Sequence, residues 1–371
     1  MINFMRLFDQ KICLFFFGFL CFSAPVFSQK YSNEFLTNGV SARAQGMGNA
    51  VIASVSDVTS GYWNPAGLAS FSPEMGLQLG AMHAEWFAGV GKFDYLGATI
   101  PLAARNRRIG FSMIRFGIDG IPNTLSLYDD DGSVNFDNVV EFSAADYAFL
   151  LSYAQKLKTK NENRRLQVGG NVKVIRRVIG QFANSWGFGV DLGAQWHFPK
   201  LKLGIVGRDL TSTFNAWNVT FTESEKEVLT ATGNDLPDIN SVEVTRPSFM
   251  LGGAWAMQFD KISFSPELNI LLTTDGKRNT LVKGDPVSLD PSLGFEIGYN
   301  DFVFFRAGVN QFQRELAFDN SETLTARPSL GVGLVLGQLK VDYAYVDVAD
   351  AENRFSHVVS LVLNLKPRSG E

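Results

Sequence analysis

The chain has 371 residues, a formal net charge of −4, and many Phe (32) and Gly (35) residues. A weakly acidic chain without a basic stripe is a poor partner for nucleic acid, so we exclude that class. The length fits one to three soluble domains or one large barrel.

Residues 1–28 have the pattern of a secretory signal peptide. Two basic residues precede the apolar core "ICLFFFGFLCF", and the small residue Ser28 fits a cleavage site. This core is too short to cross a bilayer as a helix. The alternative is a lipoprotein signal with Cys21 as the lipidated residue, which the large Leu20 before it disfavours.

Both cysteines of the chain, Cys13 and Cys21, lie inside this predicted signal. The mature chain is therefore expected to contain no thiol. This excludes thiol catalysis and any metal site that uses Cys ligands, and a secreted protein of this kind does not depend on disulfides. We predict no cofactor and no metal.

Residues 29–74 are too apolar and too rich in small residues for an ordinary surface loop. A segment enclosed in a barrel lumen cannot hold unpaired charge, and small residues let its backbone pack closely. Pro65 favours an extended Asn64, which then suits the N-cap of a short helix. The composition therefore predicts an enclosed segment, and its small or turn-forming positions include Gly46, Gly48, Asn64, Pro65, Ala66 and Gly67.

From about residue 75 onward, apolar residues alternate with small or polar ones. In "WGFGVDLGAQW", for example, Trp186, Phe188 and Val190 share one face, and Gly187, Gly189 and Asp191 share the other. Period two indicates strands. The fourteen candidate strands lie near 75–85, 91–101, 108–117, 142–156, 166–179, 185–197, 200–211, 247–258, 262–273, 291–299, 302–311, 328–337, 339–348 and 355–365.

The connections between these strands alternate in length along the chain. Every second connection is short or polar, whereas 118–141, 212–246, 274–290 and 312–327 are long. A transmembrane antiparallel barrel with periplasmic termini has this asymmetry and an even strand number. We therefore predict an all-β outer-membrane barrel over 75–371; the alternative is a secreted soluble β-protein. Aromatic residues near the short connections indicate an interfacial girdle: Trp196, Phe198, Trp255, Phe259, Tyr299 and Phe302.

The predicted inner face carries charges of both signs, which favours salt-bridged networks in a narrow lumen over a polar path. The candidate lumen charges are Arg177, Asp191, Arg208, Glu296, Arg306 and Asp342.

Two of the long connections offer candidate binding features. Phe214, Trp217 and Phe221 in 212–246 are natural anchors for a protein partner, or they pack over the barrel mouth. The run Asp129 to Asp131 has the oxygen ligands that Ca²⁺ takes, but no EF-hand pattern, so a solvated acidic loop is preferred.

An enzyme is a third possibility with little support. His83 and His357 lie on the first and last strands, which must pair, so either could meet a serine such as Ser356 or Ser360. The nucleophile motif G-x-S-x-G is missing. We predict no catalytic residue.

Two stretches carry a resemblance to a known family: "GVSARAQGMGNAVIASVSDVTSGYWNPAGLA" (Gly39 to Ala69) and "LKVDYAYVDVADAENRFSHVVSLVLNL" (Leu339 to Leu365). They resemble the FadL superfamily of outer-membrane barrels, and within it the Bacteroidetes PorV/PorQ family of type IX secretion. The resemblance implies a fourteen-stranded barrel whose N-terminal segment, residues 29–74, forms a hatch in the lumen. The structural or gating residues of this hatch are then Gly46, Gly48, Asn64, Pro65, Ala66 and Gly67. The "WNPAGLA" form is nearer to the general FadL pattern than to PorV.

Two functions follow from this resemblance. The first is an accessory or carrier role in type IX protein secretion, with the translocon and cargo proteins as partners. The alternative is passive transport of hydrophobic small molecules across the outer membrane. Both imply a Gram-negative outer membrane and contact with its lipid.

Overall fold

The computed structural model describes residues 32–71, 75–87, 89–102, 106–129, 131–161, 163–233, 235, 241–316, 322–347 and 355–365. The predicted signal peptide, with both cysteines, lies outside the described residues. So do Asp130 and residues 72–74 at the end of the predicted hatch.

The described chain begins with four short helices and continues as strands. The helices are η1 (Glu34–Thr37), α2 (Ala42–Gly46), α3 (Ser60–Trp63) and η2 (Pro65–Ser70), with η3 (Phe136–Asn138) and α4 (Glu223–Ala231) between later strands. The strands are β1 (Gln78–Trp86), β2 (Gly91–Pro101), β3 (Arg107–Asn123), β4 (Val140–Leu157), β5 (Arg165–Ile179), β6 (Ala183–His197), β7 (Leu201–Arg208), β8 (Thr213–Val219), β9 (Val242–Thr245), β10 (Ser248–Trp255), β11 (Met257–Phe259), β12 (Ile262–Thr273), β13 (Ser288–Tyr299), β14 (Val303–Leu316), β15 (Glu322–Leu336), β16 (Leu339–Asp347) and β17 (Phe355–Asn364).

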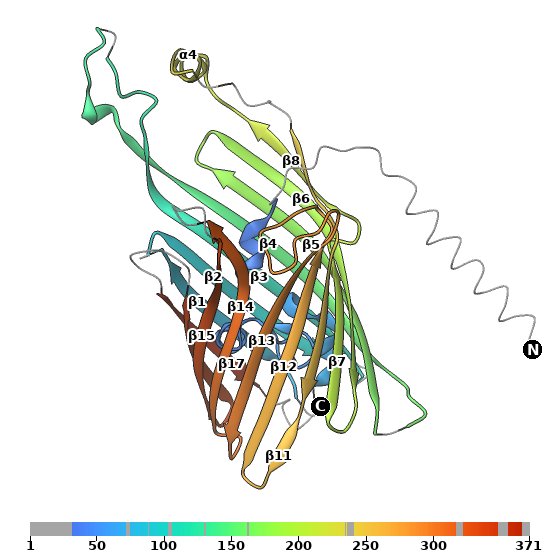
Figure 1. The fold of residues 1–371 in the computed structure, drawn as a ribbon. Coiled ribbons are helices and arrows are strands. Elements are labelled where there is room, and N and C mark those ends of the chain that lie inside the picture. The colour runs from blue at the N-terminus through green and yellow to red at the C-terminus, as the bar shows by residue number, and fades with distance from the viewer. Residues whose placement is uncertain are drawn as a thin grey trace, which may run out of the picture.

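These segments form one closed antiparallel barrel (Figure 1). Strands β7 and β8 are two parts of one wall strand, because both pair with β6, and β9, β10 and β11 are parts of the next. The described wall therefore has fourteen strands, as predicted. Pairing of Gln78 with Asn364 joins the first strand to the last and closes the barrel.

The two faces of the wall differ as the alternation predicts. Outward side chains in the middle of the wall and toward the short connections are apolar and exposed, for example Phe188 (60%) and Leu192 (53%). The aromatic residues at the short-connection end are also exposed, among them Trp196 and Trp255. An apolar belt with an aromatic edge is the surface that a lipid-facing barrel presents.

Three predicted long connections are shorter than expected, because strand pairing continues into them. Strand β3 runs to Asn123, and β14 and β15 reach Leu316 and Glu322. The region 212–246, expected as a loop, contains β8, α4 and β9. Figure 1 shows the β3–β4 hairpin and α4 rising at one end of the molecule.

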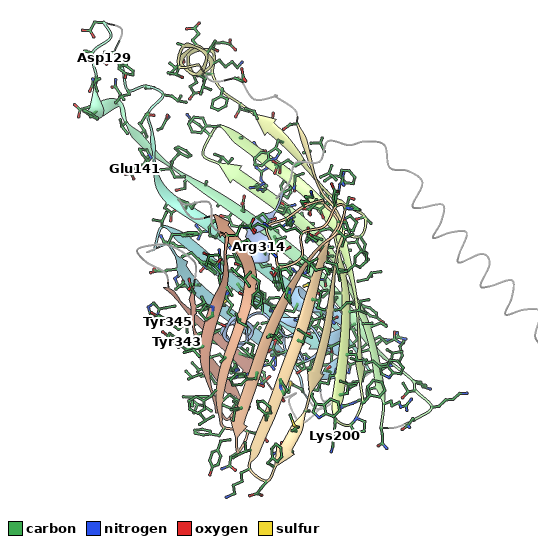
Figure 2. The ribbon with its side chains drawn as sticks, viewed as in Figure 1. Asp129, Glu141, Lys200, Arg314, Tyr343 and Tyr345 are labelled. Atoms are coloured by element: carbon green, nitrogen blue, oxygen red, sulfur yellow. The ribbon has the colours of Figure 1, made fainter. Side chains whose placement is uncertain are left out.

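The two ends of the barrel are chemically distinct. Figure 2 places Lys200 at the end with the short connections, and Asp129 and Glu141 at the opposite, long-connection end. Both Gln78 and Asn364 belong to the short-connection end. We call these the short-turn end and the long-loop end. No helix within the described ranges is long and apolar enough to cross a membrane.

Candidate functional site

The N-terminal segment, residues 32–71, lies inside the barrel with most of its side chains buried (Figure 1). Helix α2 contacts β14 to β17, and η2 contacts β3 to β6. Amide side chains of the wall bind its backbone: Asn171 Nδ2 donates to Gly61 O at 2.6 Å, and Gln195 Nε2 donates to Ile52 O at 3.1 Å. Because an unpaired buried carbonyl is costly, these side chains favour the enclosed position of the segment.

Glycines on the inner wall make room for this segment. A Cβ atom at Gly294 would lie 2.2 Å from Met47 O, and one at Gly308 would lie 2.1 Å from Gly48 N. Gly48 itself has φ +59°, and a Cβ there would lie 2.6 Å from Val309 N. The backbones of segment and wall therefore touch, which only glycine permits at these positions.

Gly46 and Gly67, two further predicted hatch residues, are equally confined. A Cβ at Gly46 would lie 3.0 Å from the Cα of Gly331, and one at Gly67 would lie 2.4 Å from Val55 O. The first contact joins the segment to the wall, and the second folds the segment onto itself.

The Asn64–Pro65 pair holds the turn between α3 and η2. Asn64 is fully buried and extended (φ −152°, ψ 103°), and its Oδ1 accepts from Ala66 N at 3.2 Å as the N-cap of η2. Its Nδ2 donates to Ile52 O at 3.0 Å and to Ala194 O of β6 at 3.2 Å. The Asn64 side chain thus caps η2, joins two parts of the N-terminal segment and binds the wall.

The six predicted lumen charges all lie on inward faces and form three separate groups. In the first group Glu296 binds Arg43 of the N-terminal segment at 3.0 Å and Arg306 at 2.7 Å. Arg306 also binds Asp342 at 2.8 Å. Burial alone would lower the pKa of Arg43, but the charge and hydrogen bond of Glu296 raise it above its ordinary value.

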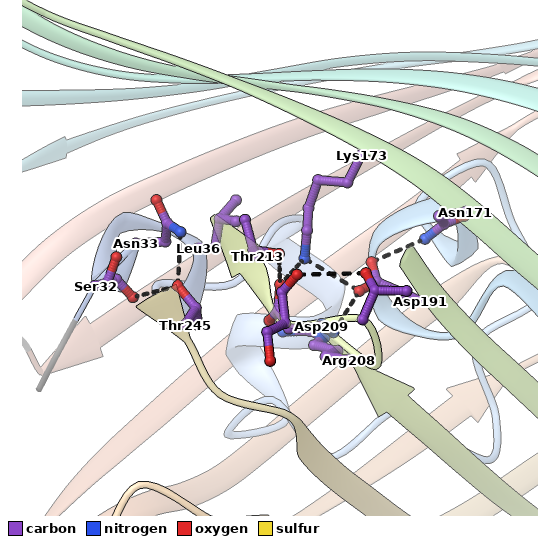
Figure 3. Close-up of polar contacts among 12 residues, drawn as sticks. Ser32, Asn33, Leu36, Asn171, Lys173, Asp191, Arg208, Asp209, Thr213 and Thr245 are labelled. Atoms are coloured by element: carbon purple, nitrogen blue, oxygen red, sulfur yellow. Dashed lines mark hydrogen bonds and ion pairs between the residues drawn. The ribbon is translucent and has the colours of Figure 1, made fainter. Parts of the chain in front are cut away.

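The second group lies at a bend of the wall (Figure 3). Lys173 Nζ lies 3.1 Å from Asp191 and 2.6 Å from Asp209, and all three side chains are largely buried. Arg208 donates to Tyr62 O at 2.9 Å, and its guanidinium lies 4.5 Å from the centroid of the Tyr62 ring. Two anions and two cations in one cluster compensate each other.

The third group lies nearer the long-loop end. Arg177 binds Asp146 at 2.8 Å and Glu243 at 3.3 Å, and its guanidinium lies 5.0 Å from the Trp217 ring centroid. Ser32, the first described residue, donates to Glu243 at 3.1 Å. The start of the N-terminal segment is therefore tied to the upper wall.

The three aromatic residues predicted as a partner-binding loop do not share a loop. Phe214 and Trp217 belong to β8, which pairs with β6. Phe214 points outward and is half exposed, whereas Phe221 stacks on Phe182 at 5.5 Å. The expected loop is wall here because its first residues continue the ladder of β6.

A second tie joins the N-terminal segment to the connection 274–287. Arg278 binds Glu34 of η1 at 3.0 Å and also pairs with Asp275. Burial alone would lower the pKa of Arg278, but hydrogen bonding to Asp275 and the charge of Glu34 raise it. The connection is thereby held over the lumen.

A cavity of about 320 Å³ lies between these ties at the long-loop end. Its apolar lining includes Leu36, Tyr62, Trp63, Leu150, Val244, Met250 and Leu271. Its charged lining includes Glu34, Lys173, Asp191, Arg208, Asp209, Arg246, Asp275, Arg278 and Asp290. The cavity is therefore amphipathic.

The wall beside this cavity is interrupted. Strand β7 pairs with β10 up to Arg208 and Ser248, and β8 pairs with β9 from Thr213 and Thr245 onward. Between these ladders, residues 209–212 and 246–247 form no strand pairs with each other. Asp209 and Ser212 both have positive φ, which bends this stretch away from a regular strand.

Sequence reasoning missed this cavity, although one signal for it exists. Pro247 cannot donate to a strand ladder, so it marks a strand end or a bulge. The contributions of η1 and of the connection 274–287 carry no comparable local signal, since they depend on how the lumen is filled.

The histidines do not form a nucleophile–base pair. His83 lies outward and binds Asp94 at 2.7 Å, and His357 lies outward and binds Tyr343 at 2.7 Å. Ser360 points into the lumen, where its Oγ accepts from Ala42 N, as strand alternation requires. Across the described stretches of the chain, no group of three or more His, Cys, Asp or Glu side chains could hold a metal ion.

No protein-family model matches the chain, and no curated protein sequence matches it. Solved structures do match. The chain is similar to the CymD monoaromatic hydrocarbon channel, with 15% identity, TM-score 0.53, and coverage of 89% of this chain and 98% of that one. It is also similar to the Pseudomonas putida toluene transporter TodX, with 11% identity, TM-score 0.52, and coverage of 88% and 98%. The chain therefore shares the barrel fold of these two proteins.

Proposed function

We propose that this chain is an integral outer-membrane barrel that lets hydrophobic small molecules cross the outer membrane. The outward apolar belt with its aromatic edge supports the location. CymD, a monoaromatic hydrocarbon channel, and TodX, a toluene transporter, share the fold and support the substrate class. The observation that carries the proposal is the amphipathic cavity beside an interrupted wall.

The cavity has the size and chemistry for such a ligand. Small-molecule sites are commonly about 300–1,000 Å³, mostly apolar, with a few polar groups. Here the volume is about 320 Å³, and Leu36, Trp63, Met250 and Leu271 supply apolar contacts. Most of the charged lining residues are paired with each other, so a neutral ligand does not need to neutralise them.

The N-terminal segment acts as the hatch in this proposal. Tyr62 and Trp63 belong to the segment and line the cavity, so a ligand in the cavity touches the hatch directly. The interruption at 209–212 and 246–247 offers a place where a ligand leaves the lumen sideways, since no ladder hydrogen bonds need to break there. The hatch and the proposed exit therefore border the same cavity.

Substitution inside the cavity tests the proposal. Met250→Trp adds bulk to a buried lining residue, and Leu251→Trp adds the same group to the next residue, which faces outward. Both variants and the wild type are expressed in a Gram-negative host without its own FadL-type transporter, and the initial rate of toluene uptake is measured. We expect Met250→Trp to lower the protein-dependent rate about tenfold and Leu251→Trp to leave it unchanged.

Heat-modifiable gel mobility controls for folding in both variants. Equal uptake with and without the wild-type barrel would contradict the proposal, as would equal rates for the two folded variants. Oleate serves as a second probe, because it distinguishes a general path for hydrophobic compounds from one limited to single rings.

A carrier role in type IX secretion is the second candidate, and one observation favours it. The long-loop end carries formed structure: η3 on the β3–β4 hairpin, and α4 with a capping box between Thr222 and Glu225. Such ordered elements suit a protein partner better than mobile loops do. Affinity isolation from native outer membranes tests this role; co-purified translocon or cargo proteins would support it, and their absence would contradict it.

A further inference from the structure

Among the described residues, exposed positive charge at the short-turn end of the barrel is concentrated on one side. Arg107 at the start of β3, Lys158, Lys160 and Arg164 between β4 and β5, and Lys200 between β6 and β7 are all exposed. We call these five residues the basic patch. Figure 2 shows Lys200 at this end.

Strand pairing brings the members of the patch together. Arg107 pairs with Gln155 near the end of β4, and Arg165 pairs with His197 near the end of β6. The three connections are therefore neighbours, spaced by two strands or about 10 Å. Within the described residues, no member of the patch forms an ion pair with an acidic side chain. Glu162 lies outside the described residues.

The other described short connections carry no net positive charge. The β11–β12 connection contains Asp260 with Lys261, the β13–β14 connection contains Asn300 with Asp301, and the β15–β16 connection contains only Gly337 and Gln338. The asymmetry is therefore local and is not a general property of this end.

Aromatic rings set the depth of the patch relative to lipid. Trp196 points outward from β6 and is 43% exposed, and its ring lies 4.8 Å from that of Phe198. The guanidinium of Arg164 lies 5.5 Å from the Phe198 ring centroid. An exposed Trp at a strand end lies at headgroup level in a barrel. The rings of Trp196 and Phe198 therefore place the guanidinium of Arg164 at the depth of the lipid headgroups.

The geometry points to a binding site for anionic glycerophospholipid headgroups of the inner leaflet, formed by the basic patch. The phosphodiester lies beside Arg164 and the lysines, and the acyl chains lie along the outward apolar wall beneath Trp196. Cations near a membrane surface attract anionic lipid individually and add up when clustered. This inference rests on the proposed membrane location and not on transport.

Lipid-selective quenching of Trp196 tests it. The full mature barrel is reconstituted in phosphatidylcholine vesicles that contain a small fraction of brominated phosphatidylglycerol or brominated phosphatidylcholine. The Trp196 signal is the difference between the wild type and Trp196→Phe. We expect at least about a fivefold preference for phosphatidylglycerol, and a smaller preference at high salt.

Two triple variants complete the test. Lys158→Gln with Lys160→Gln and Arg164→Gln should abolish the preference. The matched control removes three cations from the long-loop end, Lys226→Gln with Lys283→Gln and Arg314→Gln, and should retain it. Equal quenching by the two lipids in the wild type would overturn the inference, as would a preference that survives the first triple variant. Capture of an acidic periplasmic protein together with equal quenching would overturn it in favour of a protein partner.

Discussion

Single residues explain why a glycine-rich inner wall and a charge-poor N-terminal segment occur in the same chain. The backbones of the two parts approach so closely that Gly294 and Gly308 have no room for a Cβ atom. Amide side chains such as Asn171 and Gln195 then satisfy the carbonyls of the segment. Close packing and hydrogen bonding therefore act together to hold the segment in the lumen.

Gly48→Ala tests the close approach. Its φ of +59° and the 2.6 Å distance of a Cβ from Val309 N predict both strain and overlap. Gly233 is the matched control, because it has φ +78° and nothing within 4 Å. We expect Gly233→Ala to cost about 1 kcal/mol, and Gly48→Ala to cost about 1–3 kcal/mol more, in urea unfolding of the reconstituted barrel. Equal losses would show that the contact contributes nothing.

Glu296→Gln tests the buried charge group. The change leaves Arg43 and Arg306 without the carboxylate that both bind, and breaking a buried pair costs about 3–5 kcal/mol. Glu322→Gln, in the half-exposed pair with Arg314, should cost less than about 1 kcal/mol. The raised pKa of Arg43 keeps it protonated until the pH rises far above neutrality. The difference in cost between Glu296→Gln and Glu322→Gln should therefore not vary over neutral pH. A difference that disappears between about pH 6 and about pH 9 would contradict this.

Elements with a local sequence pattern can be predicted, whereas features that depend on distant neighbours cannot. Strand number, the lipid-facing residues and the short helix after Asn64 can be predicted, because each has a local pattern in the sequence. The wall interruption at 209–212 and the extension of β8 depend on which neighbours a strand finds. The cavity depends on how η1 and the connection 274–287 share the lumen, so no single stretch encodes it.

Arginine substitutions at two depths of β5 test the assignment of the lipid-facing wall. Val172 lies near the middle of the outward belt, and Val178 lies on the same outward face at the long-loop end of the strand. We expect Val172→Arg to cost about 2–4 kcal/mol and Val178→Arg about 0–1 kcal/mol in urea unfolding from vesicles. Similar costs at the two depths would contradict a barrel that crosses the bilayer in this orientation.

The whole molecule combines a rigid wall with a segment held by separate ties. Arg43 binds β13, Ser32 binds Glu243 of β9, and Glu34 binds Arg278. The cavity lies between these ties, and its floor belongs to the segment. Because Tyr62 and Trp63 of the segment line the cavity, we propose that part of the segment moves as a ligand passes from the cavity to the wall interruption, and this movement is the central requirement of the proposed transport.

A reducible disulfide between the segment and the wall tests most directly whether the segment must move. Ser360 Oγ of β17 lies 3.1 Å from Ala42 N, so Ala42→Cys with Ser360→Cys places two thiols within cross-linking reach in a mature chain that is expected to have no other cysteine. Toluene uptake is measured in cells with the pair oxidised and again after reduction, with each single-cysteine variant as control. We predict that oxidation abolishes protein-dependent uptake and that reduction restores it. Uptake that is equal in the oxidised and reduced states would contradict gating by the N-terminal segment.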